Sequence, residues 1–334
     1  MKASFLDKSK RIYTEEIAIP ELDADQVLVR VESVGICGSD VHYYKHGAIG
    51  PYIVENPIIL GHELSGVITA VGSGVSQDRI GSRVAVEPQR ACKVCEQCKA
   101  GRYNLCPKIE FYATPPIDGA FCEYVKIQSH FAYDIPSNIS FDAAALIEPM
   151  SVCIWAAQKA QIKEGTTVLI AGAGPIGVIM AQVARAFGAT EVVVTDIQDK
   201  RLDFVKKYGA TSTINTSTSS IGNEKFDVFV DACGVPSAVY SGILATGPAG
   251  RVLLVGLGSD EMVLPISHIQ NNEIIVTGVF RYTNTWPIGI EFLASGKVDL
   301  DAIVTHHFGL DAVEEGLNAT ALPEAMKVII HPQK

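Results

Sequence analysis

Three glycines between an apolar run and a helical run are the feature that most limits what this chain can fold into. Gly172, Gly174 and Gly177 form a Gly-x-Gly-x-x-Gly pattern after the apolar run 167–171 and before the helix-like run 175–187. This spacing allows a tight turn, a close backbone approach to a pyrophosphate and close packing of the helix on the strand. It therefore predicts a strand–turn–helix unit that binds a dinucleotide.

An acidic residue stands where a dinucleotide-binding unit needs one. Asp196 follows the next apolar run, 191–195, and lies 19 residues beyond Gly177. Its carboxylate would accept hydrogen bonds from the adenosine ribose hydroxyls and would repel a 2′-phosphate, so NAD is predicted rather than NADP. The alternative is a glycine-rich turn that binds nothing, but the strands and helix around the glycines favour the cofactor.

The pattern of expected secondary structure changes near residue 140. Residues 12–136 hold short β-rich runs broken by glycine and proline, and the alternation in 26–31 predicts a half-buried antiparallel strand. From residue 141 a helix to residue 160, interrupted at Pro149, is expected. Strands then alternate with helices, the strands being 167–171, 191–195, 227–231, 251–255 and 274–278. The Ser/Thr-rich stretch 211–223 is expected to be a surface loop.

This alternation predicts a parallel sheet with helices on both faces. We therefore expect an α/β protein with a β-barrel-like catalytic domain and a doubly wound, parallel-sheet Rossmann domain. The catalytic domain is predicted to comprise residues 1–147 and 283–334, and the Rossmann domain residues 148–282.

Two groups of residues have the character of zinc ligands. Four cysteines spaced C-x2-C-x2-C-x7-C predict a closed structural zinc site: Cys92, Cys95, Cys98 and Cys106. Cys37 and His62 come from two nearby segments and leave a coordination position open, as catalytic zinc requires. Either Glu63 or Glu148 supplies the third ligand, and the spacing does not choose between them.

Composition excludes several classes of function. A net charge of −10 disfavours nucleic acid and anionic membrane surfaces as partners. The segment before residue 8 lacks the apolar core of a signal peptide, and the eight cysteines suit metal binding in a reducing compartment. We therefore expect a cytoplasmic protein.

Several runs together resemble the medium-chain zinc dehydrogenases, and among them the sorbitol (polyol) dehydrogenases. The resemblance covers nearly the whole chain and is carried by 35–44, 60–63, 111–116, 147–152, 172–177 and 279–287. It implies a GroES-like catalytic domain, NAD, two zinc ions, a polyol substrate and a homo-oligomer of two or four chains. One departure is that Glu148 stands where the alcohol dehydrogenase branch has a second cysteine zinc ligand.

The resemblance also assigns roles to individual residues. Cys37, His62 and Glu63 resemble the zinc ligands, and Glu148 resembles the residue that exchanges with the water on zinc. The residues that resemble a polyol pocket are Tyr43, Phe111, Glu148, Arg281 and Tyr282. The residues expected to contact the cofactor are Gly172, Gly174, Pro175, Ile176, Gly177, Asp196, Arg201, Val255, Gly256, Leu257, Val279, Phe280 and Arg281.

The expected activity is NAD-dependent oxidation of a polyol at C2 to a ketose. Zinc lowers the pKa of a bound hydroxyl, Ser39 takes its proton, and His42 passes the proton to solvent. The same machinery acting on another secondary alcohol, a diol, an aldose or a threonine-like substrate is the first alternative. A zinc-lobe binding protein without catalysis is the alternative from another class.

Overall fold

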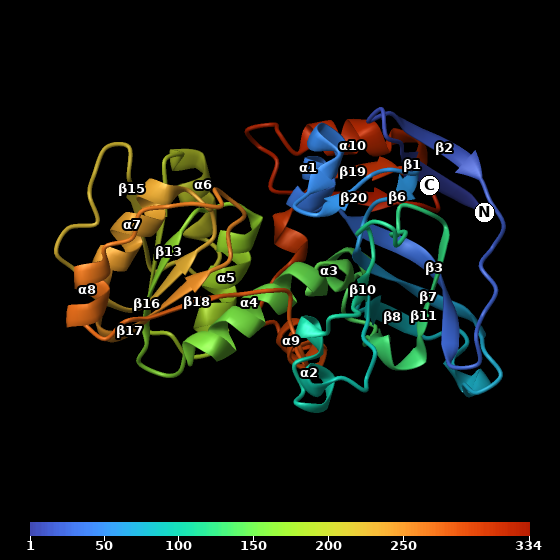
Figure 1. The fold of residues 1–334 in the computed structure, drawn as a ribbon, viewed down its shortest axis with the longest axis horizontal. Coiled ribbons are helices and arrows are strands. Elements are labelled where there is room, and N and C mark those ends of the chain that lie inside the picture. The colour runs from blue at the N-terminus through green and yellow to red at the C-terminus, as the bar shows by residue number, and fades with distance from the viewer. The chain divides into compact units, whose positions relative to one another are not determined.

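The computed structural model describes residues 1–334, and the chain divides into two compact units. Unit 1 comprises Met1–Glu148 and Leu300–Lys334, and unit 2 comprises Pro149–Asp299. Figure 1 shows the mixed α/β architecture that the sequence predicts. None of the helices is long and apolar enough to cross a membrane.

Unit 1 is built mainly of antiparallel strands. Its largest sheet has seven strands in the order β12-β8-β7-β3-β20-β19, with β11 also pairing with β3. The strands of unit 1 are β1 (Lys2–Leu6), β2 (Ile12–Glu16), β3 (Gln26–Gly35), β4 (Ala48–Ile49), β5 (Tyr52–Ile53), β6 (Ile58–Ile59), β7 (Glu63–Val71), β8 (Arg83–Val86), β9 (Gln89–Arg90), β10 (Glu110–Phe111), β11 (Tyr124–Gln128), β12 (Ala132–Asp134), β19 (Val304–Gly309) and β20 (Lys327–His331). Its helices are α1 (Gly38–His46), α2 (Glu96–Lys99), α3 (Phe141–Ala145) and α10 (Val313–Ala319).

The long strand β3 organises unit 1. It pairs with β11 and β7 along its length and with β20 at its end. Nearly all of its side chains are buried, so the expectation of a half-buried strand over 26–31 is wrong. The reason is that partners and packed side chains surround the strand, and even Gln26 is buried.

Unit 2 is a parallel sheet of six strands in the order β15-β14-β13-β16-β17-β18, the order of a Rossmann domain. Its strands are β13 (Thr167–Ala171), β14 (Glu191–Asp196), β15 (Ser212–Asn215), β16 (Phe226–Asp231), β17 (Thr246–Leu254) and β18 (Ile275–Gly278). Its helices are α5 (Pro175–Ala186), α6 (Asp199–Val205), α7 (Pro236–Ala245), α8 (Ile266–Asn271) and α9 (Trp286–Ala294), and α4 (Ile147–Ala160) runs in from the end of unit 1. Within this unit, α5 lies on one side of the sheet and α7 and α8 lie on the other (Figure 1).

Two local expectations in this part of the chain are wrong. Residues 212–215 form the edge strand β15, paired in parallel with β14, instead of a surface loop. Its Ser-Thr-Ile-Asn sequence is half-exposed and therefore carries little apolar signal. The helical break falls at Leu146, which caps α3, while Pro149 lies in the first turn of α4. Proline is tolerated there because the first N–H groups of a helix have no intrahelical partner.

The return from unit 2 to unit 1 follows α9. The predicted domain boundary was placed at residue 283, whereas the compact units change over between Asp299 and Leu300. Packing inside unit 2 accounts for this position. The ring of Phe292 on α9 packs edge-to-face on Phe187 at 5.6 Å. The side-chain amide of Gln182 both donates to and accepts from the backbone of Asp299.

Candidate active site

The start of α1 fixes the position of Cys37. Cys37 is the N-cap of this helix, and Asp40, three residues later, accepts a hydrogen bond from the backbone N–H of Cys37 at 2.9 Å. This is the reciprocal arrangement of a capping box. The other carboxylate oxygen of Asp40 accepts from the backbone N–H of Gly61 at 3.0 Å. A single fully buried carboxylate therefore ties the Cys37 segment to the His62 segment.

Cys37, His62 and Glu63 come together in unit 1. Their ligand atoms all lie within 4.8 Å of one another, and both His62 and Glu63 are buried. Glu63 opens β7, so its backbone is held by the main sheet. The structure therefore brings together the two residues that the sequence predicts to share a metal ion.

The surroundings of His62 favour a positive charge. Burial alone would lower the pKa of His62, but the nearby negative charges of Asp40 and Cys37 outweigh it and raise the pKa to about 10. The Nδ1 atom of His62 lies 3.8 Å from Asp40, which is close enough for electrostatic orientation and leaves Nε2 for another partner. A pocket that stabilises a cation on His62 is also suited to a metal cation.

Glu63 forms a buried ion pair with Lys327, a residue that the sequence analysis did not single out. The Nζ of Lys327 donates to Oε1 of Glu63 at 2.7 Å and lies 2.6 Å from Oε2. Burial would lower the pKa of Lys327, but the charges of Glu63 and Cys37 outweigh burial and raise it. The same ammonium donates to the backbone carbonyl of Ile36 at 2.8 Å. Lys327 therefore joins β20 to both segments that carry the site.

The donor set fits a zinc ion. It combines one thiol, one imidazole and a carboxylate, the ligand types that zinc takes in catalytic sites. The carboxylate of Glu63 is buried, and both of its oxygens lie within 2.7 Å of the Lys327 ammonium. Glu148, near the start of α4, is also buried and lies outside this group of ligand atoms. Its charge is near enough to raise the pKa of His62.

Three other predicted residues lie on α1, and one lies against His62. The ring of Phe111 is 5.4 Å from the ring of His62, so a residue predicted for the substrate pocket contacts the metal group. Tyr43 is buried, and Ser39 lies in the first turn of α1. His42 is exposed and its ring packs 4.5 Å from that of His46.

The four-cysteine cluster forms as the sequence predicts. The sulfurs of Cys92, Cys95, Cys98 and Cys106 all lie within 4.8 Å of one another, and none forms a disulfide. Backbone N–H groups of Val94 and Cys95 lower the pKa of the Cys92 thiol to about 6. Four converging sulfurs with N–H donors make a closed site suited to structural zinc.

The glycine fingerprint has the expected geometry in unit 2. Gly172 has a φ of +104°, and a Cβ on Gly177 would lie 1.8 Å from the carbonyl oxygen of Gly172. Only the Arg201 guanidinium, 3.7 Å away, lies near the place of a Cβ on Gly174, so the backbone there is open to a ligand. Pro175 and Ile176 begin α5 at this turn.

Asp196 and Arg201 lie beside this turn. Asp196 accepts hydrogen bonds from the N–H of Ala173 at 2.8 Å and from Ile197 and Gln198 on its other oxygen. Since a carboxylate offers about four acceptor positions, it keeps capacity for a ribose hydroxyl. The Nε of Arg201 is buried without a hydrogen-bond partner, which suits a site awaiting a polar ligand.

The remaining predicted cofactor contacts follow the strands of unit 2. The N–H groups of Val255 and Gly256 donate to the carbonyl of Asp231 just after β17, and Leu257 beyond them is exposed. Val279 donates to the carbonyl of Leu254 just after β18. These positions lie at the carboxyl ends of the strands, where open α/β sheets bind ligands.

The last predicted residues, Phe280 to Tyr282, follow Val279. The Arg281 guanidinium lies over the ring of Phe280, at 4.8 Å from its centroid, and Arg281 has a φ of +50°. Tyr282 is buried, with its ring 4.8 Å from that of Trp286. Within unit 2, Tyr282 is therefore packed in the interior, while Phe280 is 52% exposed.

Comparison with known proteins identifies the family. Residues 23–137 match the alcohol dehydrogenase GroES-like domain, and residues 175–295 match the zinc-binding dehydrogenase family. The chain belongs to the zinc-binding dehydrogenases. Sorbitol dehydrogenase of Bacillus subtilis is 44% identical over 345 residues, covering 100% of this chain and 98% of the relative.

Two further proteins are similar to this chain over nearly its whole length. The probable D-xylulose reductase A of Aspergillus clavatus is 40% identical and covers 97% of this chain and 95% of its own length. The crystal structure of a short chain alcohol dehydrogenase from E. coli CFT073, complexed with NADH, superposes with a TM-score of 0.93 at 31% identity over 99% of each chain. A zinc-binding dehydrogenase with this fold uses NAD(P) and zinc.

Proposed function

We propose that this chain is an NAD-dependent dehydrogenase that oxidises a polyol of the sorbitol or xylitol type at C2 to the ketose. One observation carries the proposal: the ligand atoms of Cys37, His62 and Glu63 converge to within 4.8 Å of one another. They do so in a chain that aligns from end to end with a sorbitol dehydrogenase. Zinc supplies Lewis acidity there, which lowers the pKa of a bound hydroxyl.

Cys37, His62 and Glu63 are the proposed zinc ligands. The position of Glu63 supports this choice, since its carboxylate is buried within the group of ligand atoms, and Glu148 lies outside that group. Glu148 is the proposed residue that exchanges with the water on zinc, and its charge acts on both His62 and Lys327. A second, structural zinc belongs to the four-cysteine cluster, and Asp40 orients His62 without touching the reaction.

The proton of the substrate hydroxyl needs a route to water. Ser39 and His42 are three residues apart on α1, so their side chains lie on the same face of that helix. Ser39 lies two residues after Cys37 in the chain, and His42 is exposed to solvent. In the proposal Ser39 accepts the proton and His42 releases it. Tyr43, Phe111, Arg281 and Tyr282 are the proposed contacts to the polyol.

Replacing Asp196 with alanine should reduce the preference for NAD over NADP by at least about tenfold. A tenfold change corresponds to about 1.4 kcal/mol, and like charges forced together cost several kcal/mol. The ratio of kcat/KM for the two cofactors measures the effect. Asp199→Ala is the matched control, because Asp199 holds Asn215 and lies in the next helix. Equal efficiencies with both cofactors in the unaltered protein would contradict the assignment.

A substrate panel tests the proposed activity itself. NADH absorbance is followed with sorbitol, xylitol, galactitol and arabinitol, and in parallel with 2-propanol, 2,3-butanediol, an aldose and threonine. We expect the highest kcat/KM on one of the four polyols, because several hydroxyls can then be held at once. A higher value on 2-propanol, the diol, the aldose or threonine would replace the polyol by that substrate class.

The proposal also covers the compartment, the oligomeric state and the partners of the enzyme. All eight cysteines are free, which supports a reducing compartment, and we place the protein in the cytoplasm. Two or four copies form a homo-oligomer, and light scattering on the purified protein reports which number applies. The net charge of −10 supports the absence of nucleic-acid and membrane partners.

A further inference from the structure

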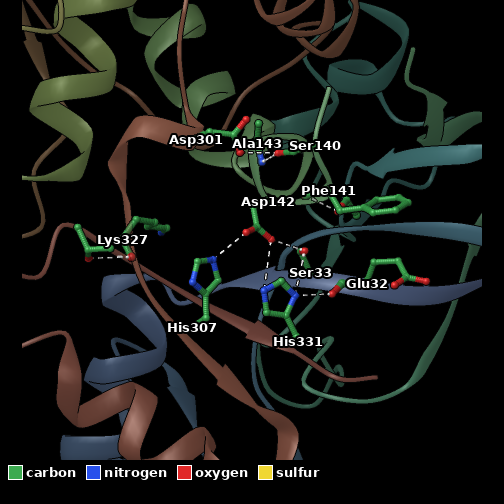
Figure 2. Close-up of polar contacts among 12 residues, drawn as sticks. Glu32, Ser33, Ser140, Phe141, Asp142, Ala143, Asp301, His307, Lys327 and His331 are labelled. Carbon is green, nitrogen blue, oxygen red and sulfur yellow. Dashed lines mark hydrogen bonds and ion pairs between the residues drawn. The ribbon is translucent and has the colours of Figure 1, made fainter. Parts of the chain in front are cut away.

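Two histidines and an aspartate from three separate elements meet in unit 1, away from both cysteine sites. Asp142 lies in the first turn of α3, His307 on β19 and His331 at the end of β20. Figure 2 shows the carboxylate of Asp142 directed between the two imidazole rings. Its Oδ2 lies 2.8 Å from Nε2 of His307, and its Oδ1 lies 3.6 Å from Nε2 of His331.

The three side chains are held in place before any ligand arrives. Nδ1 of His331 lies 3.0 Å from the backbone carbonyl of Glu32, so this nitrogen must carry the proton and donate it. That leaves Nε2 of His331 with its lone pair toward Asp142. A histidine whose second nitrogen donates to a backbone carbonyl is the arrangement typical of metal ligands. The hydroxyl of Ser33 donates to Oδ1 of Asp142 at 2.5 Å and fixes the carboxylate.

The spacing of the three ligand atoms suits a metal ion. Ligands at about 2.0–2.1 Å from a zinc ion lie roughly 3–3.4 Å from each other. The separations of 2.8 Å from Oδ2 to His307 and 3.6 Å from Oδ1 to His331 are close to that range, and one ligand atom of each residue lies within 4.8 Å of the other two. The rings of His307 and His331 are stacked with an interplanar angle of 19°, and one nitrogen of each lies within 4.8 Å of the other and of an Asp142 oxygen. In the ion-free cluster Nε2 of His307 donates to Asp142, and an ion would take the place of that proton.

We propose that Asp142, His307 and His331 form a third metal site that binds a divalent transition-metal ion of the zinc, nickel or copper type. Two imidazole nitrogens and one carboxylate favour these ions over magnesium and calcium, which prefer oxygen ligands. The side chain of His307 is 49% exposed, so the remaining coordination positions open to water and the ion exchanges freely. The site does not depend on the proposed polyol activity.

Binding at this site would join the two chain segments of unit 1. Asp142 precedes the exit to unit 2, and both histidines belong to the returning segment Leu300–Lys334. An ion held by residues from both segments binds the folded unit and not the unfolded chain. By linkage, it raises the unfolding midpoint of the protein by an amount that grows with the logarithm of the free ion concentration divided by the Kd.

The test uses the full-length protein with its cysteine sites filled with zinc, and Ni²⁺ as the added probe. Equilibrium dialysis followed by metal analysis counts bound Ni²⁺, and thermal unfolding with and without Ni²⁺ gives the midpoint shift. We expect one Ni²⁺ per chain and a rise of several degrees in the unaltered protein. His307→Gln should weaken Ni²⁺ binding at least tenfold and remove the shift.

His306→Gln is the matched control. His306 precedes His307 on β19 and therefore points to the opposite face of the strand. This variant should bind Ni²⁺ and respond to it as the unaltered protein does. Asp142→Asn keeps the shape of the carboxylate and should lose binding as His307→Gln does, which guards against a folding defect in one variant. If the unaltered protein and both site variants take up equal Ni²⁺ with equal midpoint shifts, the three residues are only an ion-pair cluster.

Discussion

Replacing His62 with alanine should lower kcat/KM for the polyol by about a thousandfold while the protein stays folded. His62 is one of three residues whose ligand atoms lie within 4.8 Å, so its removal takes one ligand from the proposed zinc. A catalytic metal contributes several kcal/mol to the transition state, and about 4 kcal/mol corresponds to a thousandfold in rate. Steady-state NADH formation and circular dichroism measure the two quantities.

His130→Ala is the control for the His62 variant. His130 lies in unit 1, its ring packs on Phe131, and it belongs to none of the metal-ligand groups. Its replacement should leave kcat/KM unchanged. The account of the site would be wrong if His62→Ala kept full activity. It would also be wrong if a destabilised His62→Ala variant regained its kcat/KM once its fold was restored.

Replacing Lys327 with methionine should destabilise the protein by about 3–5 kcal/mol. Methionine has a similar length but no charge, so Glu63 would remain buried without its cation. Breaking a buried ion pair from one side costs this much because the remaining charge is uncompensated. The carbonyl of Ile36 would lose its hydrogen bond from Nζ as well. Urea unfolding of the metal-free protein measures the effect.

Zinc and a surface lysine provide the controls for the Lys327 variant. If Glu63 is a zinc ligand, added zinc supplies the missing positive charge and should recover part of the lost stability. Lys2→Met removes a surface ion pair with Asp311, and we expect it to leave the unfolding midpoint nearly unchanged. A Lys327 variant as stable as the Lys2 variant would mean that Glu63 is protonated or satisfied by another group.

Features that depend on neighbours in the sequence were predictable. The four-cysteine spacing, the glycine fingerprint and Asp196 each carry their chemistry within one local segment, and the structure places them as expected. Strands β13, β14 and β16 were predictable because buried parallel strands are nearly continuous apolar runs. The pairing of Cys37 with His62 was inferred from residue types alone, since zinc chemistry limits the choice.

Features that depend on distant packing were not predictable. Lys327 is the first residue of β20 and precedes its apolar residues. A lysine at the start of a strand usually faces solvent. Its partner Glu63 is 264 residues away, and nothing local indicates the pairing. Asp142, His307 and His331 meet only because β20 pairs with both β3 and β19. The edge strand β15 was not predicted because its residues are mostly polar, as in a loop.

The N-terminal cap of α1 could have been predicted from the sequence. A Cys-x-x-Asp segment places a side-chain acceptor three residues after the N-cap, as in a capping box. In the structure this acceptor is Asp40, which also connects Cys37 to Gly61, the residue before His62.

The most direct measurement is the return of polyol oxidation as zinc is added back. A chelator first removes the ion from the Cys37 and His62 site, and NADH formation from NAD with sorbitol and xylitol is then followed as zinc is titrated. The account predicts negligible activity before zinc is added, and recovery in proportion to zinc that saturates after one equivalent per chain. Full-rate polyol oxidation by protein that holds zinc only in its four-cysteine cluster would contradict it.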